Sequence, residues 1–401
     1  MTVQTVEQAA LEQAADSPML PQVERWSAVN SGTGNLAGLK TVAGMLADAF
    51  AELPGDVRLV APEPVESVDT SGNIRTIERG QHLHLRVRPE APVQLLLTGH
   101  MDTVFAADHP FQSIKWLEDG VLNGPGTADM KGGIAVIRAA LAALEASPVR
   151  DRIGYDVLIN SDEETGSHAS ASLIADLAKG KTAALTYEPA LPDGTLAGAR
   201  PGSGNFSITL HGKAAHAGRN PEDGRNALIA AADLALRLNA AKAPGLKVNP
   251  ARIDGGGPNN IVPDLAVLRV NLRPDTPEDM EIAKAAIREA VAAVEREHDV
   301  HAHVHGGFNR PPKPLDARAE QLFTLVKHCG RDLGLDIAWK STGGVCDGNN
   351  IAACGVPVVD TMGPRGGAIH SSDEFLIVDS LAERAQLSTL TLLRLAEQGG
   401  L

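Results

Sequence analysis

Histidine and carboxylate side chains lie at the ends of several strand-like apolar stretches of this 401-residue chain. They are His100 and Asp102 after "VQLLLTG", Glu163 and Glu164 after "YDVLINSD", and Glu188 after "AALTY". In open α/β sheets, ligands bind outside the carboxyl ends of the strands. Polar residues at these positions therefore indicate a site more strongly than polar residues elsewhere.

Two further residues have the same chemical types. Asp129 lies in "GPGTADMKGG", between a glycine turn and a predicted helix, and His370 lies in "GAIHSSDEF". Each side chain taken alone also has an ordinary structural role, since aspartate often caps a helix and single histidines are often hydrogen-bonded structural residues. Together, histidines and carboxylates without cysteine form the ligand set that suits catalytic zinc, with cobalt or manganese as substitutes.

The adjacent glutamates allow a division of roles, although such a pair also occurs in solvated turns. Successive side chains of an extended backbone point to opposite sides. One of Glu163 and Glu164 can therefore bind metal while the other faces substrate as a base.

Strand-like and helix-like patterns alternate around these residues, which is typical of an α/β protein. Apolar strand patterns at 93–100 and 183–190 flank an amphipathic helix pattern at 132–146. After the turn-rich segment 192–205, two strand–helix pairs predict a small α+β unit, and the proline-rich segment 309–314 leads back to α/β character. We expect a doubly wound, mostly parallel sheet in a catalytic domain of residues 1–198 and 311–401, with residues 199–310 as an inserted domain.

Composition excludes several classes of protein. A formal charge of −14 argues against nucleic-acid and anionic-membrane partners. The three cysteines include no CxxC pair, which argues against a disulfide framework or a thiolate zinc site and fits a reducing compartment. The first twenty residues have no basic leader, and no apolar run reaches the roughly 18 residues of a membrane span. These features predict a soluble, cytoplasmic protein.

Seven motifs follow one another along nearly the whole chain: "GHMDTVF", "NGPGTADMKGG", "SDEETGS", "YEP", "GKAAHAG", "NNIVPD" and "IHSSDEF". This series resembles that of the di-zinc exopeptidase family that contains glutamate carboxypeptidase, aminoacylase and succinyl-diaminopimelate desuccinylase. The resemblance implies a zinc-exopeptidase-like fold, an inserted α+β domain that serves as lid and dimerisation domain, a homodimer, and two Zn²⁺ ions.

The resemblance also implies roles at the metal centre. It gives five zinc ligands: His100 and Glu188 for one ion, Glu164 and His370 for the other, and Asp129 bridging both. Asp102 would orient the imidazole of His100 through its second ring nitrogen. Glu163 would be the general base, and the Asp129–Met130 peptide bond would be cis.

Further family positions concern the substrate. They are His216, an oxyanion donor that reaches the partner's active site; Arg273, which holds a substrate carboxylate; Asn260, a polar lid contact; Arg310, an arginine shared with glutamate carboxypeptidases; and Gly343 and Gly344 in a pocket loop. From the residues alone, a turn histidine beside Gly218 is the favoured interpretation of His216, and Arg310 could equally form a hinge salt bridge. Val345 and Cys346 depart from the family loop, which leaves the side-chain specificity open.

Together these features predict a metallohydrolase that cleaves an amide bond next to a free carboxylate, similar to glutamate carboxypeptidase. The alternatives are an N-acyl-amino-acid amidohydrolase, like aminoacylase or the desuccinylase, and a non-catalytic binding protein on the same fold. The last is disfavoured because every ligand position and Glu163 carry usable residue types.

The histidines of segment 301–306 lack an accompanying carboxylate motif and indicate an exposed edge strand of the inserted domain rather than a metal site.

Overall fold

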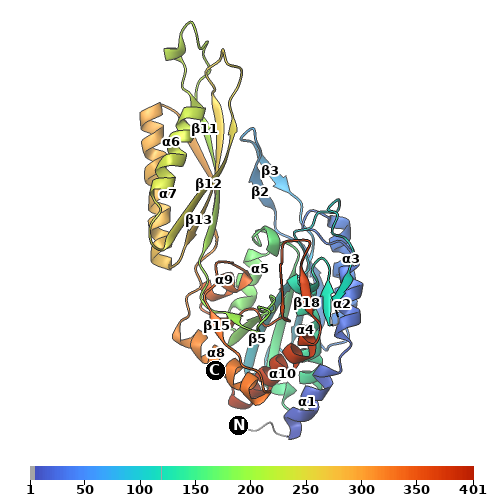
Figure 1. The fold of residues 1–401 in the computed structure, drawn as a ribbon. Helices are drawn as coiled ribbons and strands as arrows, with labels where there is room; N and C mark the ends of the chain where they lie inside the picture. Colours follow the sequence, from blue (N-terminus) through green and yellow to red (C-terminus); the bar gives the residue numbers. More distant parts are fainter. Residues whose placement is uncertain (1–4, 119) are drawn as a thin grey trace.

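The computed structural model describes residues 5–118 and 120–401. The predicted start of the catalytic domain, residues 1–4, lies outside the described residues. Figure 1 shows a larger α/β part that contains both termini and an elongated part that extends from it. Among the described residues, no helix combines the length and the apolar character that crossing a membrane requires.

A six-stranded mixed sheet forms the centre of the larger part, in the order β1-β4-β8-β5-β9-β16. The strands are β1 (Asp56–Val60), β4 (His82–Val87), β8 (Ile153–Asn160), β5 (Val93–His100), β9 (Ala183–Thr186) and β16 (Val358–Val359). β8, β5, β9 and β16 pair in parallel, whereas β1 and β4 add an antiparallel edge. The predicted parallel sheet is confirmed for the strands that lead into the candidate site.

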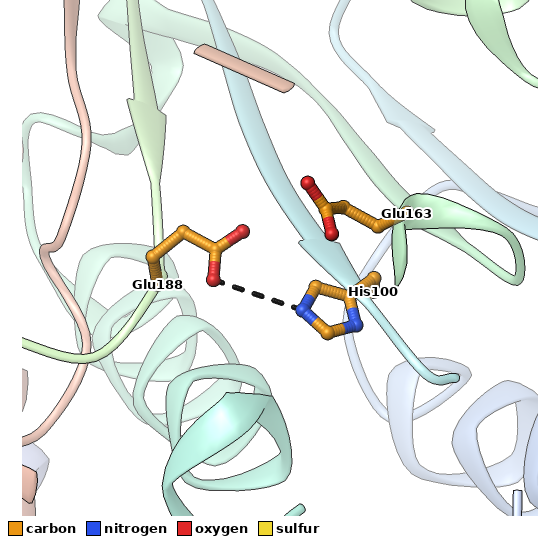
Figure 2. A group of neighbouring side chains, drawn as sticks. All are labelled: His100, Glu163 and Glu188. Atoms are coloured by element: carbon orange, nitrogen blue, oxygen red, sulfur yellow. Dashed lines mark ion pairs between the residues drawn. The ribbon is translucent and has the colours of Figure 1, made fainter. Parts of the chain in front are cut away.

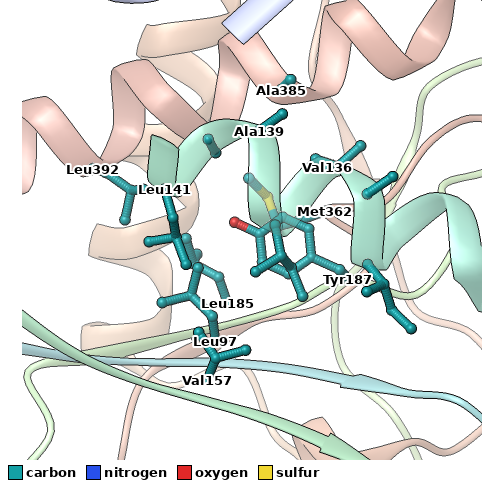
Figure 3. Packing of buried hydrophobic residues seen from close by; sticks show 14 of the residues in the cluster. Leu97, Val136, Ala139, Leu141, Val157, Leu185, Tyr187, Met362, Ala385 and Leu392 are labelled. Atoms are coloured by element: carbon teal, nitrogen blue, oxygen red, sulfur yellow. The ribbon is translucent and has the colours of Figure 1, made fainter. Parts of the chain in front are cut away.

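Helices cover both faces of this sheet. They are α1 (Thr5–Ala15), α2 (Met19–Ser27), α3 (Leu36–Phe50), α4 (Gly132–Ala146), α5 (Ala171–Ala178), α8 (Ala317–Asp332), α9 (Asp347–Ala353) and α10 (Ser380–Gln398). Figure 3 shows α4 between the strands and α10, with its Val136, Ala139 and Leu141 in the apolar core. The opposite face carries α5 and α9, where Ile174 and Ile351 are fully buried. A sheet buried on both faces places its polar residues at the strand ends.

Short strands complete the larger part. They are the hairpin β2 (Val65–Val68) and β3 (Ile74–Ile77), the pair β10 (Leu196–Ala197) and β15 (Trp339–Lys340), and the sheet of β6 (Lys115–Glu118), β7 (Val121–Asn123), β17 (Gly366–Gly367) and β18 (Phe375–Ile377).

Most of the predicted inserted domain forms a second, antiparallel sheet in the order β12-β13-β11-β14. Its strands are β11 (Ser203–His211), β12 (Leu246–Gly255), β13 (Leu265–Pro274) and β14 (His301–Arg310), and its helices are α6 (Ala227–Ala240) and α7 (Pro277–His298). The predicted two strand–helix pairs omitted β12, because Pro250 and the register shift between Pro250 and Arg252 interrupt its strand pattern. The prediction of an edge strand at 301–306 is confirmed, because β11 is the only strand of the described residues that pairs with β14.

The two crossings between the parts pair with each other. The backbone N–H of Arg200 donates to the carbonyl of Lys313 at 3.0 Å, and that of Lys313 donates back at 2.9 Å. Both side chains bind Asp360 Oδ2, at 2.8 Å for Arg200 Nε and 3.0 Å for Lys313 Nζ. Farther along, Arg269 Nη2 donates to the carbonyl of Val68 in the β2–β3 hairpin at 2.9 Å. The inserted domain is therefore held to the larger part at two separate places.

Candidate metal centre and active site

The five predicted metal ligands meet at the carboxyl ends of the parallel strands. Asp129 lies between the two histidines: its Oδ1 is 3.0 Å from His100 Nε2, and its Oδ2 is 3.4 Å from His370 Nε2. Glu188 Oε2 lies 3.7 Å from His100 Nε2, and Glu164 Oε2 lies 3.1 Å from His370 Nε2. The ligands thus form two groups that share Asp129, as a bridging carboxylate between two ions would require.

The charges of the centre fit divalent cations. Burial and the neighbouring Asp129 raise the pKa of Glu164 to about 7, and burial also raises the pKa of Glu188. Buried carboxylates that repel one another are stabilised by a bound cation. Imidazole nitrogens and carboxylate oxygens are also the donor types that zinc accepts at catalytic sites. The residues present therefore fit the implied metal.

Asp102 supports the centre in two ways. His100 Nδ1 lies 3.0 Å from the backbone carbonyl of Asp102 and 3.4 Å from its carboxylate, so the backbone shares the predicted orienting role. The carboxylate accepts hydrogen bonds from Thr33 Oγ1 at 2.7 Å and from the backbone N–H groups of Glu163 and Glu164 at 3.1 and 3.2 Å. One buried residue, through its backbone and its side chain, therefore positions both a ligand and the adjacent glutamates.

The side chains of Glu163 and Glu164 diverge as predicted, but not for the predicted reason. β8 ends at Asn160, and the glutamates lie in a short helical turn rather than on an extended strand. Figure 2 shows the Glu163 carboxylate beside His100 and Glu188, whereas Glu164 contacts His370. Burial raises the pKa of Glu163 well above its usual range, although the nearby Arg310 opposes this shift. Such a shift favours uptake of a proton by this carboxylate.

Glu374 is a structural member of the centre that the sequence patterns did not single out. Its buried carboxylate accepts the backbone N–H groups of Gly126, Ala128 and Asp129 at 3.1, 3.0 and 3.1 Å. These bonds fix the loop that carries Asp129, whose peptide bond to Met130 is cis, as the resemblance implied. The only sequence signal was its position four residues after His370.

The residues predicted to contact the substrate lie in two separate places. Gly344 lines the cavity at the metal centre, while the Gly343 carbonyl accepts from Arg273 Nη1 at 3.1 Å across the gap to β13. His216 and Asn260 lie together instead, since the Ala217 N–H donates to the Asn260 carbonyl at 3.0 Å. Their loops follow the far ends of β11 and β12, at the tip of the inserted domain away from the larger part (Figure 1).

The length of β11 gives the distance from the crossing between the two parts to the tip of the inserted domain. β11 spans nine residues from the crossing to the tip, or roughly 30 Å at 3.3 Å per residue. His216 is therefore not brought to the metal centre of its own chain. In this arrangement its Nδ1 accepts the Gly218 N–H at 3.1 Å, in a local turn.

Comparison with known proteins agrees with this geometry. The family model described as "Peptidase family M20/M25/M40" matches residues 96–394. The chain belongs to this family. Carboxypeptidase G2 of Pseudomonas sp. (strain RS-16) is 30% identical over 383 residues, which cover 92% of this chain and 87% of that protein. The succinyl-diaminopimelate desuccinylase of Psychrobacter arcticus is 28% identical over 319 residues, or 73% of this chain and 76% of that protein.

Solved structures show the same fold. The crystal structure of a tripeptidase from Staphylococcus aureus subsp. aureus mu50 superposes with a TM-score of 0.70 at 22% identity, covering 98% of this chain and 99% of that one. Family membership and the ligand geometry together identify a metal-dependent hydrolase.

In this M20 family chain, a cavity of about 270 Å³ opens beside the metal ligands. Besides the ligands and Glu163, its lining includes the apolar side chains of Leu191, Val345 and Ile369, together with Cys346. Cys346 is buried, and burial raises the pKa of its thiol well above the usual range, so the thiol contributes packing rather than a thiolate nucleophile. None of the described residues that line the cavity is Phe, Tyr or Trp.

Proposed function

We propose that this chain is a di-zinc hydrolase that cleaves an amide bond next to a free carboxylate, in the manner of a glutamate carboxypeptidase. The observation that carries the proposal is the position of Asp129 between His100 and His370, with Glu163 at the edge of the centre. The 30% identity to a protein named Carboxypeptidase G2 supports the choice of reaction.

In this proposal His100, Glu188, Asp129, Glu164 and His370 hold the metals. Bound zinc lowers the pKa of a coordinated water and polarises a carbonyl group. Glu163 accepts the proton of the attacking water and returns it to the leaving amine, a role worth about 10²–10⁴-fold in rate. Arg273, on the strand that faces the Gly343 loop, pairs with the free carboxylate of the substrate.

Metal removal tests the proposed cofactor. We expect purified protein to bind about two divalent ions per chain, because Asp129 offers one oxygen to each histidine-containing group. A chelator should abolish turnover, and added zinc, cobalt or manganese should restore it. Elemental analysis that finds one ion or none in fully active protein would contradict the two-ion centre.

A substrate panel tests the proposed reaction. Peptides and acyl compounds that end in glutamate should release the free amino acid, whereas the matching carboxamides should react at least about tenfold more slowly, because a charged pair to Arg273 is lost. Equal hydrolysis of acids and amides would exclude recognition of the carboxylate.

The same panel decides between two related activities. An N-acyl-amino-acid amidohydrolase is the second candidate, supported by the relative named as a desuccinylase and by the absence of Phe, Tyr and Trp among the described residues lining the cavity. Small acyl groups should then be preferred over bulky aromatic ones. The non-catalytic alternative predicts no released product from any compound.

We further propose a cytoplasmic homodimer that forms through the inserted domain. The distance of His216 from its own metal centre supports a role in the partner's site, where it would stabilise the oxyanion. Ile229 and Leu236 of α6 and Ile282 of α7 are 55%, 69% and 56% exposed, which suits a surface buried in a dimer. The net charge of −14 supports neither a nucleic-acid nor a membrane partner.

A further inference from the structure

Arg310 lies where the chain leaves the inserted domain, as the last residue of β14. Its side chain is only 3% exposed, so its charge must be balanced inside the protein. Arg310 Nη2 donates to Glu163 Oε1 at 2.6 Å and to the Glu163 carbonyl at 3.2 Å. Arg310 therefore contacts both the carboxylate and the backbone carbonyl of Glu163, the proposed base.

The other side of the guanidinium is anchored to α9. Arg310 Nη1 pairs with Asp347 Oδ1 and donates to Asn350 Oδ1 at 2.8 Å. Asp347 is fixed in turn by Asn160 Nδ2 at 2.7 Å and by Ser167 Oγ at 2.5 Å. Since both of its terminal nitrogens bind buried or partly buried acceptors, the guanidinium has one defined position.

α9 also holds the two crossings to the inserted domain. Asn349 Nδ2 donates to the carbonyls of Pro201 and Pro311 at 2.9 and 2.8 Å, and Asn350 Nδ2 donates to the carbonyl of Asn309 at 2.8 Å. The backbone of Arg310 is thus fixed on both sides. The whole assembly, from the crossings through α9 to Glu163, is one hydrogen-bonded unit.

We propose that Arg310 is a positioning residue that holds the carboxylate of Glu163 in place, rather than a ligand of the substrate. A substrate carboxylate that captured the guanidinium would leave Glu163 and Asp347 as buried carboxylates without their cation, which is strongly unfavourable. The inference rests on the proposed role of Glu163 and adds a residue that acts through it. It also separates Arg310 from Arg273, which remains the candidate for the substrate carboxylate.

A double-mutant cycle on kcat tests this inference. Arg310→Met should lower kcat by about 10²-fold, because a base without a fixed position loses most of its contribution, while KM changes by less than about threefold. In the Glu163→Gln background, the same change should lower kcat no further, because residues that act as one unit are not additive. Arg273→Met is the matched control and should raise KM with a smaller effect on kcat.

Two outcomes would overturn the inference. If Arg310→Met and Glu163→Gln have multiplicative effects on kcat, Arg310 does not act through Glu163; if Arg310→Met raises KM tenfold with kcat unchanged, it binds substrate. Thermal unfolding verifies that each variant is folded, and metal analysis verifies that each variant binds its metals. Should Arg310→Met fail to fold, Arg310→Lys keeps the charge but only one contact, and the same cycle applies. A fully active Glu163→Gln would instead refute the proposed base itself.

Discussion

Glu163→Gln is expected to lower kcat by at least about 10²-fold while both metals stay bound. The amide keeps the shape of the side chain but cannot accept the proton of the attacking water. Glu163 lies beside the ligands His100 and Glu188, but its carboxylate pairs with Arg310, so metal affinity should change little. Turnover assays, elemental analysis and the binding of a substrate analogue would measure the three quantities separately.

Glu164→Gln is the matched control, because it alters the neighbouring residue by the same single atom. Glu164 Oε2 contacts His370 Nε2 at 3.1 Å, so the loss of its charge should weaken one metal and lower the metal content. If the two variants lose metal and activity in the same way, the assignment of base and ligand within "DEET" is wrong.

The metal centre could be predicted from the sequence because most of its residues follow strands that are recognisable from local sequence. His100 ends β5, and Glu188 lies two residues after the end of β9. A buried strand produces an apolar run that is visible without any knowledge of its neighbours. The carboxyl ends of parallel strands then lie together by the geometry of the sheet, so local pattern sufficed to predict a shared site.

The contacts that support the ligands and Glu163 could not be predicted in this way, because they join residues far apart in the chain. Arg310 reaches Glu163 across 147 positions, and Glu374 reaches Asp129 across 245. No periodicity connects such pairs, and a buried arginine has the same local sequence as an exposed one. The sequence accordingly left substrate binding and a salt bridge open for Arg310, and the distances favour the salt bridge.

Recognition of β12 failed for a different reason. Its side chains alternate between buried and exposed only from Leu246 to Asn249, because the register with β13 shifts between Pro250 and Arg252 and interrupts the pattern. Tertiary pairing with β13 along nine positions stabilises the strand despite Pro250. Propensity and pattern therefore underestimate edge strands of this kind.

The position of His216 leads to the second large expected effect. If each active site combines the metals and Glu163 of one chain with His216 of its partner, Glu163→Gln and His216→Ala should each form nearly inactive homodimers. A mixture of the two variants should nevertheless recover activity. In a mixed dimer, one site keeps its own Glu163 and metals and receives the intact His216 of the other chain, so its composition is wild type.

The expected recovery follows from two-fold symmetry. Random reassembly of equal amounts makes about half of the dimers mixed, and each mixed dimer has one intact site of two, so about a quarter of wild-type activity should return. Mixing Glu163→Gln with Asp129→Ala is the control, because both changes damage the same centre and no intact site can form. Subunit exchange is verified by tagging the two chains differently and isolating dimers that carry both tags. Doubly tagged dimers without activity would show that His216 acts within its own chain or takes no part in the reaction.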